Sequence, residues 1–342
     1  MKLMKLMACA ALAVACAVGF TGCSKKVDAS KPRVADGAVL ALVVQAPTKT
    51  SLAPLVEKYK LNDVKAALEK APADAKEFFE KIELDKIESK WLLVTVGGEI
   101  AKDKVPDVAF VAATTLDLDK FVAEFEKSAK GEKKPEFKKT TIAGVSAYEI
   151  TSKKDKVVPC VAALDGQLII VASSAAFLEK QIALYRDGKG ESADFSSFGL
   201  PGNGILRIKA VKVGDVVKKA LGEDAAMLEM VNGIIPEGDK IVLGLNSVEI
   251  ALSASDDGKN AKLDLTVETA SDADAEKLIT AAKGGLTMAT AAAKETVKDE
   301  SDKAAALGAL ESATAVNEGK VAKISAAAPA EPIFKLVSEM IK

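Results

Sequence analysis

Short apolar runs separated by tight turns recur along this chain and alternate with amphipathic segments. A strand is predicted over 37–45 and is followed by a helical segment over about 51–68, and the same order recurs at 204–210 and 213–221. Strands joined by short turns pair antiparallel, and an amphipathic helix needs a sheet to cover. We therefore predict an α+β fold in which helices pack on one face of largely antiparallel sheets.

The second half of the chain repeats the order of elements in the first half. Each half has two apolar strands and then a helix that begins with hydroxyl and carboxylate side chains, which cap and electrostatically favour a helix start. These elements are predicted over 91–98, 107–113 and 114–122, and again over 247–253, 262–268 and 269–279. Hairpins over 140–150 and 313–324 then follow.

These matches predict a tandem duplication in which each half forms its own sheet. The first half spans 36–187, the turn-rich linker 188–203, and the second half 204–342. The alternative is a chance coincidence of strands and helices in an α+β chain. The alanine-rich stretch 272–312 is predicted to be mostly helical, with a possible interruption at Gly284-Gly285.

The N-terminal segment has the charge pattern of a secretion signal. Lys2 and Lys5 precede an apolar run over 6–20 that is too short to span a membrane, and Thr21-Gly22 lead into Cys23. The stretch Phe20-Thr21-Gly22-Cys23 resembles the lipobox of bacterial lipoproteins, with Phe20 where that family usually has Leu. Ordinary secretion through the same segment is the alternative.

The resemblance implies that residues 1–22 are a signal peptide and that Cys23 carries the lipid after cleavage. It also implies a cell-envelope location, and Ser24 favours the outer membrane over the inner one. Residues 23–35 are polar and contain Pro32, so they predict a flexible tether with a reach of ~40 Å. The protein would face the periplasm or the cell surface, and the membrane would be its partner through the lipid on Cys23.

Composition restricts the chemistry. The chain has no histidine, which excludes Ser-His-Asp and Cys-His catalysis and removes the commonest transition-metal ligand. A net charge of −2 and a single tryptophan, Trp91, argue against a nucleic-acid partner. If Cys23 is lipidated and the signal is removed, Cys160 is the last cysteine left. It lies in an apolar run and is predicted to be a buried structural thiol.

Carboxylates spaced by two residues suggest a calcium loop at Asp272, Asp274 and Glu276. Lys277 and Lys283 stand where an EF-hand loop needs glycine and glutamate, so a helix start is favoured over a metal site.

Asp117 and Asp119 are likewise interpreted as carboxylates at a helix start and not as metal ligands. Gly202-Asn-Gly204 precedes a strand and is therefore predicted to be a turn, not a dinucleotide fingerprint. The sequence around Ser146 lacks the second glycine of a nucleophile elbow, so we interpret Ser146 as a structural residue. For Gly97-Gly98 a bulge or turn is favoured over a backbone position that a ligand approaches.

No motif specifies a reaction, a cofactor or a metal. The sequence therefore predicts a cell-envelope lipoprotein that acts as a non-catalytic binding or scaffolding module, with a protein or an apolar molecule as ligand. The main alternative is a periplasmic carrier of lipid or another small apolar ligand, held between apolar sheet faces. An enzyme that depends on carboxylates or Lys is the less favoured third possibility.

Overall fold

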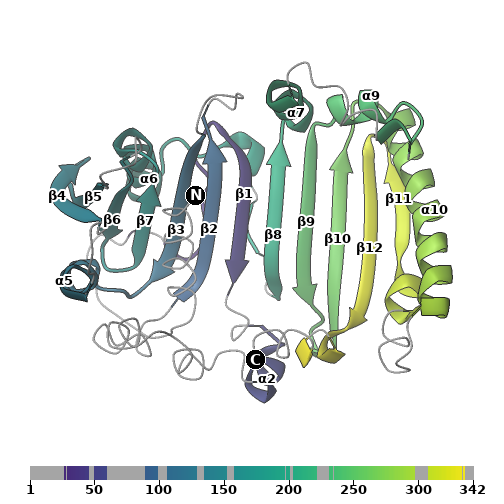
Figure 1. The fold of residues 1–342 in the computed structure, drawn as a ribbon, viewed down its shortest axis with the longest axis horizontal. Coiled ribbons are helices and arrows are strands. Elements are labelled where there is room, and N and C mark those ends of the chain that lie inside the picture. The colour runs from purple at the N-terminus through teal and green to yellow at the C-terminus, as the bar shows by residue number, and fades with distance from the viewer. Residues whose placement is uncertain are drawn as a thin grey trace.

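The described residues form one antiparallel sheet of twelve strands, seen face-on in Figure 1. The computed structural model describes residues 27, 29–45, 50–59, 89–98, 106–128, 135–151, 158–196, 198–200, 203–221, 231–233, 235–296, 307–332 and 334–335. The strands of the first half are β1 (Ala38–Gln45), β2 (Ser89–Gly97), β3 (Asp107–Thr114), β4 (Glu136–Ile142), β5 (Val145–Thr151), β6 (Cys160–Leu164) and β7 (Leu168–Ala172). Those of the second half are β8 (Gly204–Val211), β9 (Ser247–Ala254), β10 (Asn260–Glu268), β11 (Thr314–Glu318) and β12 (Val321–Pro329).

The α+β class and the antiparallel pairing are confirmed, but the prediction of a separate sheet for each half is wrong. The strand order is β11-β12-β10-β9-β8-β1-β2-β3-β7-β6-β5-β4, so β1 and β8 join the halves. Leu42 of β1 lies opposite Ile208 of β8. Each of these strands begins its half and would otherwise be an unpaired edge, so their pairing removes two exposed rows of backbone donors and acceptors.

Outward from the β1–β8 pair, the order β1-β2-β3-β7-β6 on one side matches β8-β9-β10-β12-β11 on the other. The hairpin β4–β5 is added beyond β6, at the outer edge of the first half. The predicted hairpin over 140–150 therefore occupies a different place in the sheet from the one over 313–324. The shared order does not by itself establish a duplication.

Six α-helices have both ends among the described residues: α2 (Ala53–Lys58), α5 (Leu118–Ser128), α6 (Ala175–Asp187), α7 (Val213–Leu221), α9 (Gly238–Leu243) and α10 (Asp272–Thr296). The helix α6 begins where Ser174 accepts a hydrogen bond from the amide of Phe177 and ends at the left-handed Gly188. The helix α10 runs through Gly284-Gly285 without a break. Of the helix predicted over 51–68, residues 60–68 lie outside the described residues.

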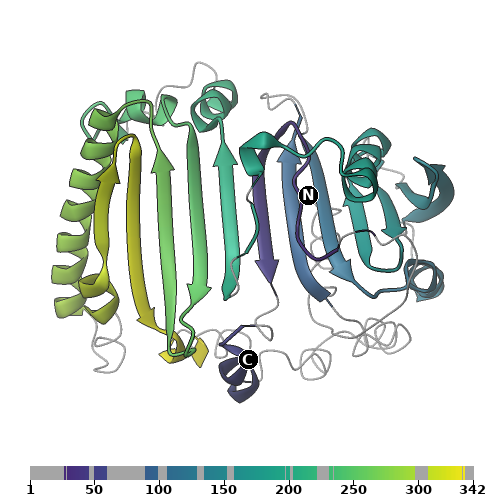
Figure 2. The same ribbon diagram turned by 180° about the vertical axis from the view of Figure 1, so that it is seen from behind.

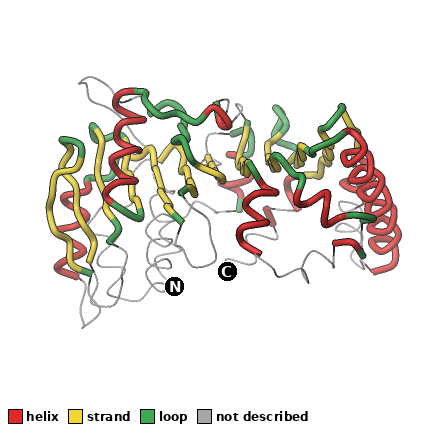
Figure 3. Tube along the Cα trace, turned by 90° about the horizontal axis from the view of Figure 1, so that it is seen from above, coloured by secondary structure: helices red, strands yellow, loops and turns green. Residues whose placement is uncertain are grey.

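The prediction that helices pack on one face is wrong: the sheet has two faces with different covers, and Figure 3 shows helices on both sides of it. We call the first the α6 face: Leu93 and Ile170 are fully buried on it against Leu178 of α6. We call the opposite one the α10 face. There Ile324 packs with Ile279 of α10, and Val171 packs with Val122 of α5.

On the α6 face the second half is polar and half-buried, because β8, β9 and β10 alternate polar and aliphatic residues. Arg207 forms a bidentate ion pair with Glu249, with N–O distances of 2.9 and 3.0 Å, and its guanidinium lies over the ring of Phe198. Lys209 lies over the ring of Phe195. The predicted linker thus packs its two aromatic rings against the seam between β1 and β8.

Candidate functional site

Residues 27 and 29–36 form a segment that lies across the α6 face, and Figure 2 shows this segment in front of β2 and β3. We call residues 27 and 29–36 the N-terminal strap. Val27 and Ala29 are 5% and 6% exposed, and Val34 and Ala35 are 1% and 3% exposed. All four side chains belong to the main hydrophobic core. The strap is therefore part of the packed body.

Two aromatic side chains hold the middle of the strap. The indole Nε1 of Trp91 donates to the carbonyl oxygen of Ala29 at 3.1 Å. The hydroxyl of Tyr185 accepts a hydrogen bond from the amide of Arg33 at 2.9 Å and donates to the carbonyl oxygen of the same residue at 3.2 Å. The two rings stack with their centroids 6.2 Å apart. One strand residue and one helix residue thus hold the backbone of the strap.

The two ends of the strap are fixed at opposite ends of the sheet. The amide of Val27 donates to a carboxylate oxygen of Asp165, in the β6–β7 turn, at 3.3 Å. At the other end Ala35 forms an antiparallel bridge with Glu191. The amide of Asp36 then donates to the carbonyl oxygen of Gly190 at 2.7 Å. The strap therefore spans the length of the first-half strands.

The described part of the predicted tether, residues 27 and 29–35, is thus packed on the sheet. Sequence reasoning missed Trp91, Tyr185 and Asp165 as the residues that hold it. The available signal was the apolar pair Val34-Ala35 inside an otherwise polar stretch. Cys23 itself lies outside the described residues, as does the signal segment.

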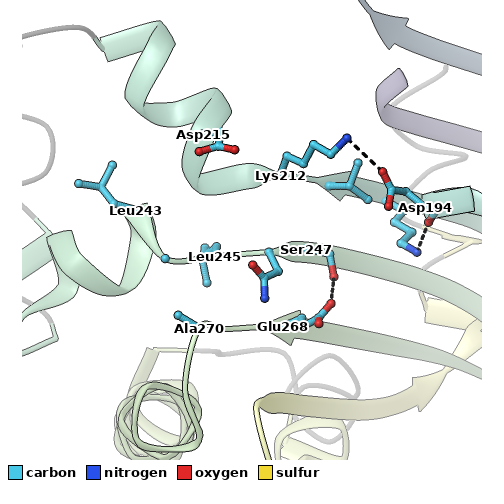
Figure 4. A pocket seen from close by; sticks show the side chains of 12 residues that line it. Asp194, Lys212, Asp215, Leu243, Leu245, Ser247, Glu268 and Ala270 are labelled. Carbon is cyan, nitrogen blue, oxygen red and sulfur yellow. Dashed lines mark hydrogen bonds and ion pairs between the residues drawn. The ribbon is translucent and has the colours of Figure 1, made fainter. Parts of the chain in front are cut away.

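An open polar cleft of about 520 Å³ lies at the end of the sheet where β8 leads into α7 (Figure 4). Its walls come from the end of β8, the start of α7, the loop between α9 and β9, and Asp194. Lys212, which connects β8 to α7, has a left-handed backbone with φ of 54°. This conformation turns the chain sharply from the strand into the helix.

The polar groups of the cleft bind one another. The amine of Lys212 lies 3.4 Å from the carboxylate of Asp194, and the amine of Lys209 donates to the carbonyl oxygen of Asp194 at 2.6 Å. The hydroxyl of Ser247 donates to Glu268 at 3.1 Å. Charges of both signs line the cleft in similar number, so its field favours neither an anion nor a cation.

The α10 face presents aliphatic side chains across the central strands. Cross-strand pairs place Val94, Leu42, Ile208, Ile250 and Leu265 in one row. Each residue of this row is half-buried. Leu263, in the neighbouring row, is 48% exposed. This surface lies between α5 and α10, which cover the outer strands.

The acidic pairs considered as metal ligands lie in the first turns of helices. Asp272 and Asp274 begin α10, and Asp274 accepts a hydrogen bond from the hydroxyl of Ser271 at 2.6 Å. Asp117 accepts one from the amide of Lys120 at the start of α5. Within the ranges that the structure describes, no group of three or more acidic or cysteine side chains is placed to hold a metal ion.

Asp119, in the first turn of α5, accepts hydrogen bonds from Tyr148 and from Lys139, the latter at 3.3 Å. The bond from Tyr148, reinforced by Lys139, lowers the pKa of Asp119. Burial and the same carboxylate raise the pKa of Tyr148. These interactions tie α5 to the β4–β5 hairpin.

Most of the remaining candidate residues lie in strands and turns. Cys160 is a free, buried thiol on the α6 face, and burial raises its pKa. Ser146 lies on β5. Gly98 has φ of +77°, and a side chain at Gly97 would meet the backbone of Gly37 at 2.9 Å. Gly204 starts β8, whereas Gly202 lies outside the described residues.

A shared carboxylate joins the loop before α9 to α10. Glu237 forms ion pairs with Lys240, at 2.8 Å, and with Lys277. Hydrogen bonds and charge from the two amines lower the pKa of Glu237 to about 2. All three side chains are exposed to solvent, so this cluster stiffens the surface and does not form an enclosed site.

Comparisons with known proteins give no family assignment. No family model matches the chain, and no curated protein matches it. A solved structure described as crystal form I of TP0453 is 12% identical and covers 89% of this chain and 94% of that chain, with a TM-score of 0.37. Among the described residues, no helix has both the length and the apolar character needed to cross a membrane.

Proposed function

We propose that this chain is a lipid-anchored protein of the bacterial cell envelope that acts as a non-catalytic binding or scaffolding module. The lipobox-like Phe20-Thr21-Gly22-Cys23 supports the anchor. The observation that carries the proposal is the N-terminal strap: the packed body begins at Val27, four residues after Cys23. A lipid at Cys23 would therefore be attached four residues before the first residue of the hydrophobic core.

The remaining parts of this proposal follow from the sequence. Residues 1–22 would be removed as a signal peptide, and Ser24 favours the outer membrane over the inner one. The matching strand order on the two sides of the β1–β8 pair supports a tandem duplication. The packed strap and core, together with a wide sheet that displays polar groups on one face, suit a scaffold that is held at the membrane.

A carrier of lipid or a small apolar ligand is a second candidate, supported by the α10 face. Aliphatic side chains continue across five neighbouring strands there, and burying them against acyl chains would contribute ~25 cal/mol per Å². The ligand would need no charged partner, because the row through Leu42 and Ile208 contains only aliphatic side chains. A scaffold would instead leave this face to a protein partner.

The anchor is tested by mass spectrometry and membrane fractionation of the full-length protein and Cys23→Ser in a Gram-negative host. Cys16→Ser is the matched control, because it removes a cysteine from the same segment but leaves the lipobox intact. We expect acylated, membrane-bound protein from the parent and the control, and unacylated protein from Cys23→Ser. An acyl mass that survives Cys23→Ser contradicts the proposal.

Native mass spectrometry with organic extraction separates the two candidate functions. The protein is purified gently from its own envelope after Cys23→Ser, so that no covalent lipid contributes. A stoichiometric lipid or small molecule would favour the carrier. A clean mass of the protein alone would favour the scaffold, and affinity capture of protein partners would follow.

A further inference from the structure

We infer that the end of the sheet at the β6–β7 turn faces the lipid bilayer, and that the polar cleft at the opposite end faces away from it. This inference rests on the proposed lipidation of Cys23. It names the bilayer surface as the partner and the β6–β7 end of the first half as the surface that meets it. Three features of the chain support it.

The first feature is the length of chain between the lipid and the core. Three residues separate Cys23 from Val27, so at ~3.6 Å per residue the lipidated residue lies within ~14 Å of Val27. This is much shorter than the ~40 Å expected for a free tether over 23–35. The body therefore has little freedom to move away from the bilayer.

The second feature is where the strap begins. The amide of Val27 is bonded to Asp165, in the β6–β7 turn, and its side chain is 5% exposed. This turn lies at the end of the sheet where β3 ends, because the amide of Thr114 donates to the carbonyl oxygen of Gln167. The lipid is thus attached at one end of the sheet, beside the β6–β7 turn.

The third feature is the direction of the strap. It runs from Asp165 to the bridge between Ala35 and Glu191, which lies at the end of the sheet where β1 begins. The eight residues of β1 span about 27 Å at ~3.4 Å per residue. Because β8 runs antiparallel to β1, it ends at this same far end, next to the cleft that Lys212 lines.

The consequence is a fixed polarity of the anchored molecule. Val27 lies near the headgroups, whereas the cleft lies roughly a strand length, about 27 Å, further out. A soluble partner can therefore reach the cleft without touching the bilayer. The bonds of Trp91 and Tyr185 keep the strap on the sheet and so preserve this orientation.

The test measures the distance of two labelled positions from the bilayer. The variants Gln167→Cys, at the β6–β7 turn, and Lys189→Cys, in the far loop, are made in the full-length protein and labelled with a fluorophore. The purified proteins are reconstituted into phosphatidylcholine vesicles that contain nitroxide-headgroup lipid. The parent protein is the labelling control, because Cys160 is 1% exposed. The acyl mass is measured on the same samples.

We expect quenching by the headgroup nitroxide to be severalfold stronger for Gln167→Cys than for Lys189→Cys. A flexible Gly/Ser linker of about sixteen residues between Lys26 and Val27 has a root-mean-square reach of ~22 Å and should remove most of that difference.

Equal quenching at the two positions of acylated protein, or stronger quenching at Lys189→Cys, would overturn the orientation and leave the lipoprotein function intact. Protein without an acyl mass would refute the proposed function, and the orientation with it.

Discussion

The hydroxyl of Tyr185 should stabilise the N-terminal strap by an amount that can be measured. Tyr185 is 3% exposed, and its hydroxyl bonds to both the amide and the carbonyl oxygen of Arg33. Tyr185→Phe removes these two hydrogen bonds but keeps the ring that stacks on Trp91. The substitution therefore changes the polar contacts of the strap and almost nothing of its packing.

The expected cost follows from the burial of the groups that lose their partner. A hydrogen bond contributes about 0.5–1.5 kcal/mol, and a buried group left without its partner costs about 1–3 kcal/mol. Arg33 is only half-buried, so water can reach the backbone groups that lose their partner. The lower part of the range for a buried group without its partner therefore applies. We expect Tyr185→Phe to lower the free energy of unfolding by about 1–2 kcal/mol.

Urea unfolding of the soluble Cys23→Ser protein measures this change, and hydrogen exchange locates it. Tyr59→Phe is the matched control: its hydroxyl donates to the exposed carboxylate of Glu331 at 3.0 Å, so its loss should change stability by less than ~0.5 kcal/mol. Exchange should rise over residues 29–36 in Tyr185→Phe alone. If both variants have the same stability and the strap exchanges as in the parent, the reasoning about the clamp is wrong.

Four further predictions concern other parts of the molecule. Gly214→Ala should destabilise the protein by about 1–3 kcal/mol in a denaturant titration, because the new methyl would lie 2.0 Å from a carbonyl oxygen of α9. Gly284→Ala, in an open stretch of α10, should stabilise it by about 0.5–1 kcal/mol. The pKa of Glu237 is about 2 in the folded protein, so its ion pairs stabilise the fold fully above pH 4.5 and are lost as the pH falls towards 2. Lys277→Ala should raise that pKa in an NMR titration, and an unchanged pKa would exclude the ion pair. Cys160 should react with a thiol reagent only after unfolding, since it is buried and its pKa is raised; rapid reaction of the native protein would contradict this.

Local sequence patterns predicted many of the strands and helices because their signals are local. The turn Asp256-Asp-Gly-Lys-Asn260 marks the β9–β10 hairpin, and the alternation on its two sides sets one polar and one apolar face. Ser174 caps the start of α6, and the left-handed Gly188 ends it. Elements of this kind need only neighbours in sequence to be recognised.

The pairing of β1 with β8 was not predictable in the same way. Both strands are apolar enough to be central, but no local signal shows which distant strand each one meets. The strap was missed for a related reason. Its polar residues and Pro32 are typical of a tether, and its fixed position depends on Trp91 and Tyr185, which lie 62 and 152 residues from their partners.

The candidate site was predictable only at the level of chemistry. The absence of histidine removed whole reaction classes, and the carboxylates at 272–276 were correctly favoured as a helix start. The cleft is lined by residues near the ends of β8 and α9 and by Asp194 of the predicted linker, so no motif marks it. The orientation that we propose at the membrane depends on the position of the strap on the α6 face, which no local motif marks.

Hydrogen–deuterium exchange of residues 27–36 in the full-length protein is the most direct test of the central claim, that the packed body begins at Val27, four residues after Cys23. The strap amides of Ala29, Arg33 and Asp36 are hydrogen-bonded, and its apolar side chains are buried. We predict protection comparable to that of β2, on which it lies. Exchange at the rate of an unstructured chain would show that residues 23–35 are a free tether and would contradict both the strap and the orientation it imposes.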